Sequence, residues 1–327
     1  MAVLVTGGAG YVGSVAAELL LEAGERVVVL DNLSRGHRKA VARGAEFVEG
    51  DTRDRALLDK LLKQHGIQAV MHFAAFALVG ESVQNPAIYF ENNVSGSHTL
   101  LNAAVDSGVK QFIFSSTCAT YGFPERVPLT EDLPANPITP YGLSKLMVEE
   151  MLDWYGKAYG LRYVALRYFN ACGATEAHGE DHEPETHLIP NIFKAITGQS
   201  GPLKVFGGDY DTPDGTCIRD YVHVADLIDA HMKAAAYLRK GGASGHFNLG
   251  TETGNSVLEV IRAVERVTGI SVPFEISARR PGDADALVAS SAKARELLGW
   301  RPLKRDIEVV VEDAWRWRRA RPNGYEG

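Results

Sequence analysis

The chain has 327 residues, of which 45% are hydrophobic, and its 34 basic and 41 acidic residues give a formal charge of −7. This length suits one large or two medium globular domains, and the acidic balance argues against nucleic acid as a partner. No apolar run is long enough to span a membrane, no basic leader precedes the first strand, and the three cysteines lie far apart. We therefore expect a cytoplasmic protein that makes no membrane contact and keeps its thiols reduced.

Short apolar runs alternate with helical patterns through the first half of the chain. The runs expected to form strands are VLVTG, RVVVL, EFVEGD, AVMHFAA, QFIFSS and RYVALRYFN. Helices are expected at 11–24, 53–65, 86–107 and 141–159. Alternation of this kind predicts βα units, and therefore an α/β protein with a Rossmann-type, doubly wound parallel sheet covered on both faces.

The pattern changes after about Ala171, where the elements become shorter and mixed. We expect a nucleotide-binding domain at 1–171 and a smaller mixed α/β substrate domain at 172–327. The segment GHFNLG at 245–250 resembles another strand, so the chain is expected to rejoin the first sheet within about 220–250.

Three glycines, Gly7, Gly10 and Gly13, follow the first expected strand and open a helix. Glycine permits a tight turn and a close approach of backbone to a pyrophosphate, which then lies on the helix N-terminus. An ordinary glycine-rich turn is the alternative, but the strand, turn and helix context favours a dinucleotide site. The spacing Gly-x-x-Gly-x-x-Gly is typical of the short-chain dehydrogenase/reductase group.

Asp31 ends the second expected strand, eighteen positions beyond Gly13. A carboxylate at this point accepts hydrogen bonds from the adenosine ribose and repels a 2′-phosphate, so NAD is favoured over NADP. Arg35, His37 and Arg38 follow closely and could favour the phosphate instead, although a solvated basic loop explains them equally well.

Tyr141 and Lys145 stand four residues apart at the start of an expected helix, in the stretch TPYGLSKLMVEE. Residues at i and i+4 share a helix face, so the phenol and the ammonium project together. An amphipathic helix with an exposed lysine is the simple explanation. The functional one is that Lys145 lowers the pKa of the phenol and makes Tyr141 a general base.

Together these residues, in this order, resemble the extended short-chain dehydrogenase/reductase superfamily, and within it the UDP-glucose 4-epimerases. The similarity runs along nearly the whole chain through GGAGYVGS, HFAAFALVGES, ENNVSGS, FIFSSTCATYG, PYGLSKLMVEE, LRYFNACGA, DGTCIRDYVHVADL, FNLGT and RRPGDADAL. The resemblance implies an NAD-dependent epimerase that interconverts UDP-galactose and UDP-glucose through a transient 4-keto sugar.

The resemblance also implies roles for single positions. The catalytic residues would be Thr117, Tyr141 and Lys145. Besides Tyr141 and Lys145, the positions that match cofactor contacts are Gly7, Gly10, Tyr11, Val12, Gly13, Asp31, Asn32, Asp51, Thr52, Phe73, Ala74, Asn92, Ser115, Tyr168 and Phe169. The positions around the UDP-sugar are Thr117, Asn170, His187, Leu188, Phe206, Arg219, Tyr221, Arg280, Asp283 and Leu287.

Several alternatives to this function are weighed on the residues. Related dehydratases carry an Asp-Glu pair after the threonine, and decarboxylases a glutamate nearby; here Cys118 and Ala119 follow Thr117, which disfavours both reactions. Epimerisation of UDP-N-acetylhexosamines or UDP-pentoses stays open, with Leu287 bearing on the range. A non-enzymatic NAD-binding sensor is less favoured, because it would not need Thr117, Tyr141 and Lys145 together.

Two further features concern metal and assembly. The segment HGEDHEPETH at 178–187 is rich in His and Glu, so a metal site is one interpretation. It lies on an expected loop without close ligand spacing, and the family that the chain resembles needs no metal, so none is expected. Segments 86–107 and 141–159 are expected to pair with their copies as a homodimer, as the resemblance implies. The alternative is that the apolar stripe Met147, Met151, Leu152 and Tyr155 faces its own sheet.

Overall fold

A seven-stranded parallel sheet forms the centre of the computed structural model, which describes residues 1–280 and 282–326. Its strands lie in the order β11 (Gly245–Leu249), β6 (Arg162–Tyr168), β5 (Gln111–Thr117), β4 (Ala69–His72), β1 (Ala2–Thr6), β2 (Arg26–Asp31) and β3 (Glu46–Glu49). All neighbours in this order pair in parallel. Strands β1 and β5 are buried along their whole length, as expected for a sheet covered on both faces.

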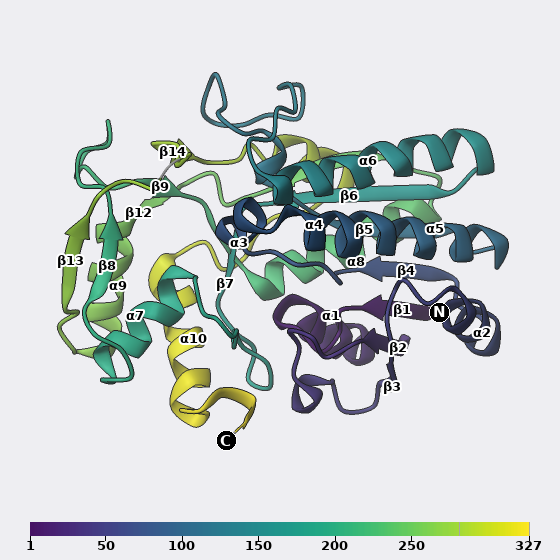
Figure 1. Cartoon of the computed structure of the whole chain (residues 1–327), viewed down its shortest axis with the longest axis horizontal. Coiled ribbons are helices and arrows are strands. Elements are labelled where there is room, and N and C mark those ends of the chain that lie inside the picture. Colours follow the sequence, from purple (N-terminus) through teal and green to yellow (C-terminus); the bar gives the residue numbers. More distant parts are fainter. Residues whose placement is uncertain (281, 327) are drawn as a thin grey trace.

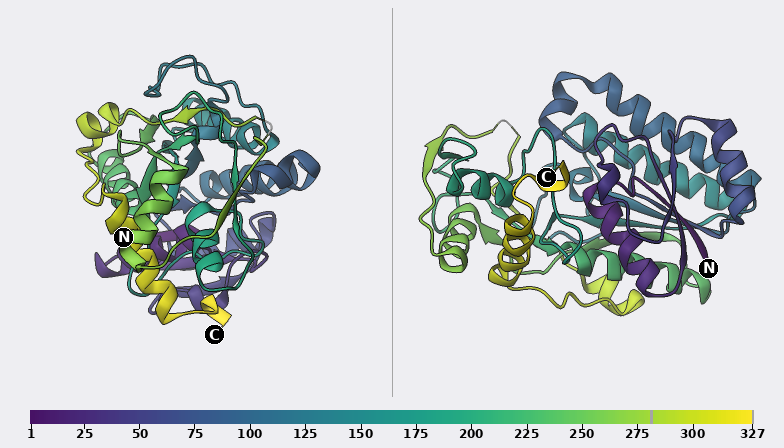
Figure 2. Two further views of the ribbon diagram at one scale, coloured as in Figure 1. Left: turned by 90° about the vertical axis from the view of Figure 1, so that its left-hand side faces the viewer. Right: turned by 90° about the horizontal axis from the view of Figure 1, so that it is seen from below.

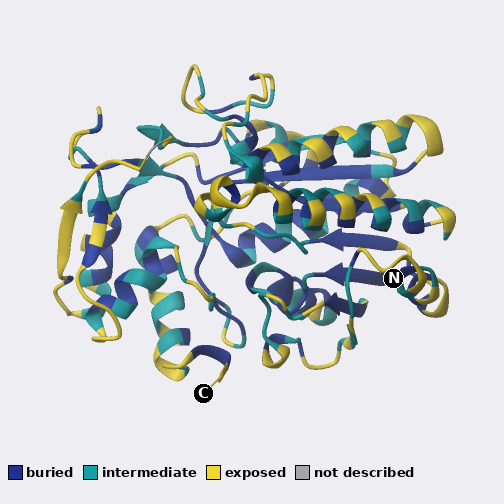
Figure 3. Cartoon of the chain, viewed as in Figure 1, coloured by how far each residue is buried: buried dark blue, intermediate teal, exposed yellow. Residues whose placement is uncertain are grey.

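Helices cover both faces of this sheet (Figure 2). Those on one face are α1 (Tyr11–Glu22) and α8 (Val224–Arg239). Those on the other are α2 (Arg55–His65), α5 (Gly96–Asp106) and α6 (Pro140–Tyr159). Each layer has its own apolar core against the strands, and the outward helix faces are exposed (Figure 3). The predicted Rossmann-type fold class is confirmed.

The helix predicted at 86–107 forms, but it is not α-helical throughout. After the short helix α3 (Val79–Gln84), α4 (Pro86–Tyr89) continues into a π-helical segment at Phe90–Ser95, which runs directly into α5. An extra residue per turn in such a segment shifts the side chains that follow it around the helix axis. Periodicity at 3.6 residues per turn could not predict this shift.

Helix α6 begins and ends where its sequence provides the caps. The Thr139 hydroxyl accepts a hydrogen bond from the backbone N–H of Gly142, and Pro140 occupies the first helical position, where no N–H is needed. Gly160 ends the helix in the left-handed conformation, at φ +69°, which favours glycine. These caps place Tyr141 in the first turn of the helix.

The C-terminal part forms a smaller group of elements beside the sheet (Figure 1). Its strand pairs and short sheet are β7 (Asn170–Cys172) with β10 (Tyr221–His223), β8 (Leu203–Phe206) with β13 (Phe274–Ser277), and β12 (Asn255–Ser256), β9 (Ile218–Arg219) and β14 (Ala286–Leu287). Its helices are α7 (Leu188–Ile196), α9 (Val257–Thr268) and α10 (Ile307–Ala320), which share one apolar core.

The chain crosses between the two parts more than once. Strand β11 comes from residues 245–249, after the first strands of the smaller part, and pairs with β6 at the edge of the central sheet. We propose the division into a nucleotide-binding domain at 1–171, completed from about 220–250, and a substrate domain in the remainder. Within the described residues, none of the helices has the length and apolar character needed to cross a membrane.

Candidate active site

The glycine turn follows β1 directly and is packed too closely for side chains. Gly7 has φ +72°, and a Cβ there would lie 2.6 Å from the backbone nitrogen of Ala74. A Cβ on Gly13 would lie 2.1 Å from the carbonyl oxygen of Gly7. Gly10 is the N-cap of α1 without a side chain to occupy the helix end. The turn therefore leaves the helix N-terminus open to a phosphate group.

The carboxylate of Asp31 lies at the end of β2, beside this turn. It accepts hydrogen bonds from the backbone N–H groups of Ala9, at 2.9 Å, and Leu33, at 2.8 Å. Burial raises the pKa of Asp31, and these two hydrogen bonds oppose that rise. An acid fixed here by the backbone suits a ribose with free hydroxyls.

A second acidic residue lies on the next strand connection. The Asn32 amide donates to the Asp51 carboxylate at 2.9 Å, and Arg53 pairs with the same carboxylate at 2.8 Å. The hydrogen bonds from Arg53 are the main reason that the pKa of Asp51 is lowered well below its usual range. Thr52 is buried beside it. The predicted cofactor residues Asn32, Asp51 and Thr52 thus lie together.

Most other predicted cofactor positions lie where the parallel strands end. Phe73 and Ala74 follow β4, Ser115 lies near the end of β5, and Tyr168 ends β6. The hydroxyls of Ser115 and Tyr168 hydrogen-bond to each other. Carboxyl ends of parallel strands share one edge of a sheet, which is where ligands of open α/β folds bind.

The remaining predicted cofactor residues lie at the margins of this edge. Phe169 follows β6 and is buried, and Asn92 lies in the π-helical segment before α5. Tyr11 and Val12 begin α1. The Tyr11 hydroxyl donates to the carbonyl oxygen of Gly173 at 2.6 Å, so its side chain is directed at the loop after β7.

Thr117, Tyr141 and Lys145 meet at the end of β5. Thr117 is the last residue of β5, and its hydroxyl accepts a hydrogen bond from the backbone N–H of Ala119 at 3.1 Å. Lys145 is buried on α6 and donates to the carbonyl oxygen of Ser115 at 2.8 Å. Tyr141, one turn earlier on α6, is half-buried, with Thr117 close enough to hydrogen-bond its hydroxyl.

Burial shifts the pKa values of both Tyr141 and Lys145. Burial raises the pKa of Tyr141 to about 12, and the Thr117 hydrogen bond only partly opposes it. Burial likewise lowers the pKa of Lys145 to about 7, although the charge of Glu149 opposes this. In the chain without its cofactor, burial thus opposes the lowering of the Tyr141 pKa that the sequence leads us to expect, and the role of Lys145 stays a prediction for the protein with NAD bound.

Sequence reasoning missed several residues that support the site. Asn93 accepts a hydrogen bond from the backbone N–H of Phe76 and donates to the hydroxyl of Ser144, which ties the β4 loop to α6. His231 on α8 lies against Phe73, with ring centroids 4.8 Å apart, and near Tyr168. Burial lowers the pKa of His231 to about 4, so it is neutral. Asn93 and His231 act through contacts between segments far apart in the sequence, and no pattern in the sequence indicates such contacts.

The smaller part contributes the predicted UDP-sugar residues. The Arg219 guanidinium donates to the carbonyl oxygens of Ile218 and Ala284, at 2.8 and 2.9 Å, and pairs with Asp283 at 3.2 Å. The Arg280 guanidinium lies 4.0 Å from the ring centre of Phe206. Strand β14 brings Leu287 into register with Arg219 on β9. Arg219 and Leu287 thus lie on neighbouring strands of the short sheet, while Arg280 lies against the end of β8.

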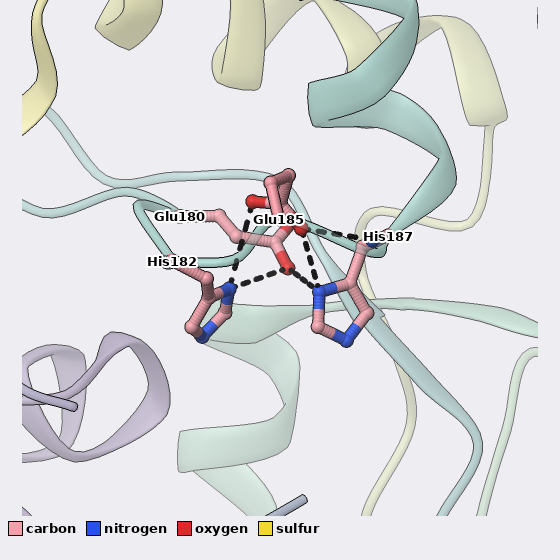
Figure 4. A group of neighbouring side chains, drawn as sticks. All are labelled: Glu180, His182, Glu185 and His187. Carbon is pink, nitrogen blue, oxygen red and sulfur yellow. Dashed lines mark hydrogen bonds and ion pairs between the residues drawn. The ribbon is translucent and has the colours of Figure 1, made fainter. Parts of the chain in front are cut away.

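Other predicted substrate positions lie on the connections toward this sheet. Asn170 begins β7, directly after the central sheet, and Tyr221 on β10 pairs with it. His187 caps α7 and Leu188 is its first residue. His187 also belongs to a group with Glu180, His182 and Glu185 that the loop before α7 brings together (Figure 4).

A glycine turn, an acid at the end of the second strand and a Tyr/Lys pair at one edge of a parallel sheet define a dinucleotide-dependent enzyme of Rossmann type. Residues 3–250 match the NAD dependent epimerase/dehydratase family, and the chain belongs to this family.

Relatives cover the whole chain. It is 52% identical over 328 residues to the UDP-glucose 4-epimerase of Lactobacillus helveticus, covering 100% of this chain and 99% of that protein. A crystal structure of a UDP-glucose 4-epimerase superposes with a TM-score of 0.98 at 49% identity, covering 100% of both chains. The crystal structure of the Brucella ovis UDP-glucose 4-epimerase in complex with NAD superposes with a TM-score of 0.94 at 50% identity, covering 97% of this chain and 98% of that chain. The predictions of the family and of NAD as cofactor are confirmed.

Proposed function

We propose that the chain is an NAD-dependent epimerase that interconverts UDP-galactose and UDP-glucose. The main support is that the chain is 52% identical to a UDP-glucose 4-epimerase over its full length. Its Thr117, Tyr141 and Lys145 also meet at the same edge of the sheet as the glycine turn. This agrees with the expectation from the sequence. Epimerases of UDP-N-acetylhexosamines or UDP-pentoses are not favoured by these relatives, and neither is a non-enzymatic sensor.

In this proposal the chain moves one proton and holds the sugar. When bound, NAD accepts a hydride from C4 of the sugar and returns it. Tyr141, as phenolate, takes the proton of the 4-hydroxyl and gives it back, and the Thr117 hydroxyl bridges the two by hydrogen bonds. Lys145 favours the phenolate through its positive charge. Dehydration and decarboxylation each need an acidic side chain near Thr117. None follows it here, because burial raises the pKa of Cys118 to about 12 and Ala119 carries no acid.

Inversion also requires the 4-keto sugar to turn over while the nucleotide stays in place. Arg219 and Arg280 are suited to anchoring the diphosphate, because a guanidinium binds phosphate oxygens in pairs. Arg219 is fixed by two backbone carbonyl oxygens and Asp283. Arg280 lies over Phe206. With the diphosphate held by these arginines, the sugar can rotate against less polar neighbours such as Leu287.

The proposal includes a homodimer formed through α6 and the helices beside it. Leu152 faces the protein core, so the apolar stripe predicted from the sequence is only partly available. A second stripe, Leu143, Met147 and Trp154, is exposed on the outer side of α6 by 39%, 37% and 67%. Burial of such a stripe against its copy gives an isologous contact. The free thiols of all three cysteines support a cytoplasmic location.

Conversion of UDP-galactose by the purified protein tests the proposed function. Proton NMR should show UDP-glucose forming until the two sugars reach a fixed ratio, the same ratio from either side. NAD should be released when the protein is denatured, because each turnover regenerates it. No conversion by NAD-loaded protein, or release of NADP instead, would contradict the proposal.

A further inference from the structure

The loop between β7 and α7 gathers two histidines and two glutamates, Glu180, His182, Glu185 and His187. One ligand atom from each lies within 4.8 Å of the others (Figure 4). Both imidazoles turn Nδ1 toward the carboxylates. The loop folds back on itself, which is why irregular spacing along the chain still produces a compact set.

The separations between these atoms, up to 4.8 Å, bracket the edge length of a coordination tetrahedron, and two of them are close to it. The Glu180 Oε1 atom lies 2.9 Å from His187 Nδ1 and 3.4 Å from His182 Nδ1. The Glu185 Oε2 atom lies 3.7 Å from His182 Nδ1. Ligands about 2.0–2.2 Å from a Zn²⁺ ion are about 3.3–3.6 Å apart in a tetrahedral site.

The two glutamates need positive charge close to them. Their side chains are only 9% and 2% exposed, for Glu180 and Glu185, and buried carboxylates are costly unless a cation compensates them. Two protonated histidines would supply this charge. Burial lowers the pKa of each imidazole, but the carboxylates raise it by more, to about 9 for His182 and about 10 for His187. A divalent ion bound by neutral imidazoles gives the same charge balance.

Hydrogen bonding at His182 favours the bound ion. The Oε1 atom of Glu185 accepts from the backbone N–H groups of Thr186 and His187, both at 2.8 Å, and lies 3.0 Å from His187 Nδ1, while Oε2 is the atom that faces His182. The buried Nδ1 of His182 has no hydrogen-bond partner within the part of the chain that the structure describes. A protonated imidazole would donate from this atom, whereas a metal ligand has no proton on it.

We propose that Glu180, His182, Glu185 and His187 bind one divalent transition-metal ion of the Zn²⁺ class. Imidazole nitrogens with carboxylates in a tetrahedral arrangement suit Zn²⁺, whereas Mg²⁺ and Ca²⁺ prefer six or more oxygen ligands. Four protein ligands close the coordination shell, so the site is structural and takes no direct part in the sugar chemistry. The backbone hydrogen bonds to Glu185 are the outer contacts that orient such a ligand.

The site lies where a bound ion would stabilise the start of α7. His187 caps α7, so the ion fixes the start of the helix that carries Leu188. Tyr11, from the glycine turn, packs edge-on against His182 with ring centroids 6.1 Å apart. The ion therefore fixes the loop against which the start of α1 packs and which leads into the segment predicted to contact the UDP-sugar.

The test is Zn²⁺ binding by the full-length protein after removal of metals with a chelator. Isothermal titration and metal analysis should give one Zn²⁺ per chain, and Mg²⁺ should not compete. Bound Co²⁺ should give the intense visible absorption of a four-coordinate site, and X-ray absorption should detect two imidazole ligands. Zn²⁺ should also raise the melting temperature of the metal-free protein.

Matched variants locate the ion. Glu185→Gln and His182→Gln should each weaken Zn²⁺ binding at least about tenfold, the lower bound for loss of even an outer partner. Glu183→Gln changes an exposed glutamate of the same loop outside the cluster and should bind as the unaltered protein does. A protein that binds no Zn²⁺, or one whose binding is unchanged in both cluster variants, would overturn the proposal. That result would leave the proposed epimerase activity untouched, because conversion of UDP-galactose is measured separately.

Discussion

The Lys145 ammonium is held by strand β5 rather than by its helix neighbour Tyr141. It donates to the carbonyl oxygen of Ser115 at 2.8 Å and lies 4.9 Å from the ring centre of Phe114. Its environment is apolar, and burial lowers its pKa to about 7. Near neutral pH the lysine is therefore close to the point at which it gains or loses its charge, and neighbouring charges decide its state.

The first prediction concerns pH. Tyr141 acts as a base only when ionised, so kcat should rise with pH. The phenolate and the Lys145 ammonium stabilise each other's charge, so Lys145 keeps its proton when Tyr141 ionises. Together with a cationic cofactor ring it should bring the apparent pKa about 1–3 units below the value of about 12 for Tyr141 in the chain by itself. Lys145→Met removes one of these charges and should move the profile upward by about one unit. Lys157→Met, an exposed position on the same helix, is the control. Identical profiles for all three proteins would refute this role for Lys145.

The second prediction concerns the phenol. Tyr141→Phe should lower kcat by about two or more orders of magnitude, the usual contribution of a general base. Folding and retention of NAD should be unaffected, as judged by the melting temperature and by NAD released on denaturation. Tyr159→Phe removes an exposed phenol from the same helix and should leave kcat unchanged. Near-normal turnover in Tyr141→Phe would exclude the proposed mechanism.

The third prediction concerns the glycine turn. A Cβ on Gly13 would overlap the carbonyl oxygen of Gly7, which is backbone and cannot rotate away. Gly13→Ala should cost about 1–3 kcal/mol of unfolding free energy and release NAD during purification. Gly201→Ala is the matched control, because nothing lies within 4 Å of its added Cβ. If Gly13→Ala retained a full equivalent of NAD, this turn would not be the phosphate site.

The fourth prediction concerns assembly. The unaltered protein should sediment at twice the chain mass at micromolar concentration. Met147→Glu places a charge in the middle of the exposed stripe on α6, where burial without a partner is costly, and should give monomers. Val309→Glu introduces the same charge at a side chain of similar exposure on α10, 38% against 37%, and should remain dimeric. A monomeric unaltered protein would rule out the proposed homodimer.

The fifth prediction concerns substrate range. Leu287 packs partly buried beside Tyr121 and Phe169, and it offers no hydrogen bond to an acetamide. UDP-galactose should therefore be preferred over UDP-N-acetylgalactosamine. Leu287→Ser should lower the ratio of their kcat/KM values at least several-fold, since one such change in a pocket is worth about 1–3 kcal/mol. Leu303→Ser, at an 87% exposed position, should not change it. Equal use of both sugars by the unaltered protein would contradict this role.

The sequence predicted the central sheet well because its signals are local. Glycines after β1, the acid ending β2 and the apolar runs of buried strands can each be recognised without knowing what packs against them. The pKa of Tyr141 could not be predicted, because it depends on how far the folded chain removes the phenol from water. The sequence shows that the loop at 178–187 is rich in His and Glu, but not that Glu180, His182, Glu185 and His187 converge, since a loop has no periodicity from which to infer which side chains meet.

Strand β11 has a consequence for the order in which the protein is made. The central sheet is completed only by residues 245–249, so a ribosome has synthesised three-quarters of the chain before β6 gains its outer neighbour. Until then β6 is an unpaired sheet edge, and such edges are templates for aggregation. A nascent or truncated chain that stops near residue 171 would expose this edge permanently. Expression of the first domain alone should therefore give insoluble protein, even though it contains the glycine turn and the Tyr/Lys pair.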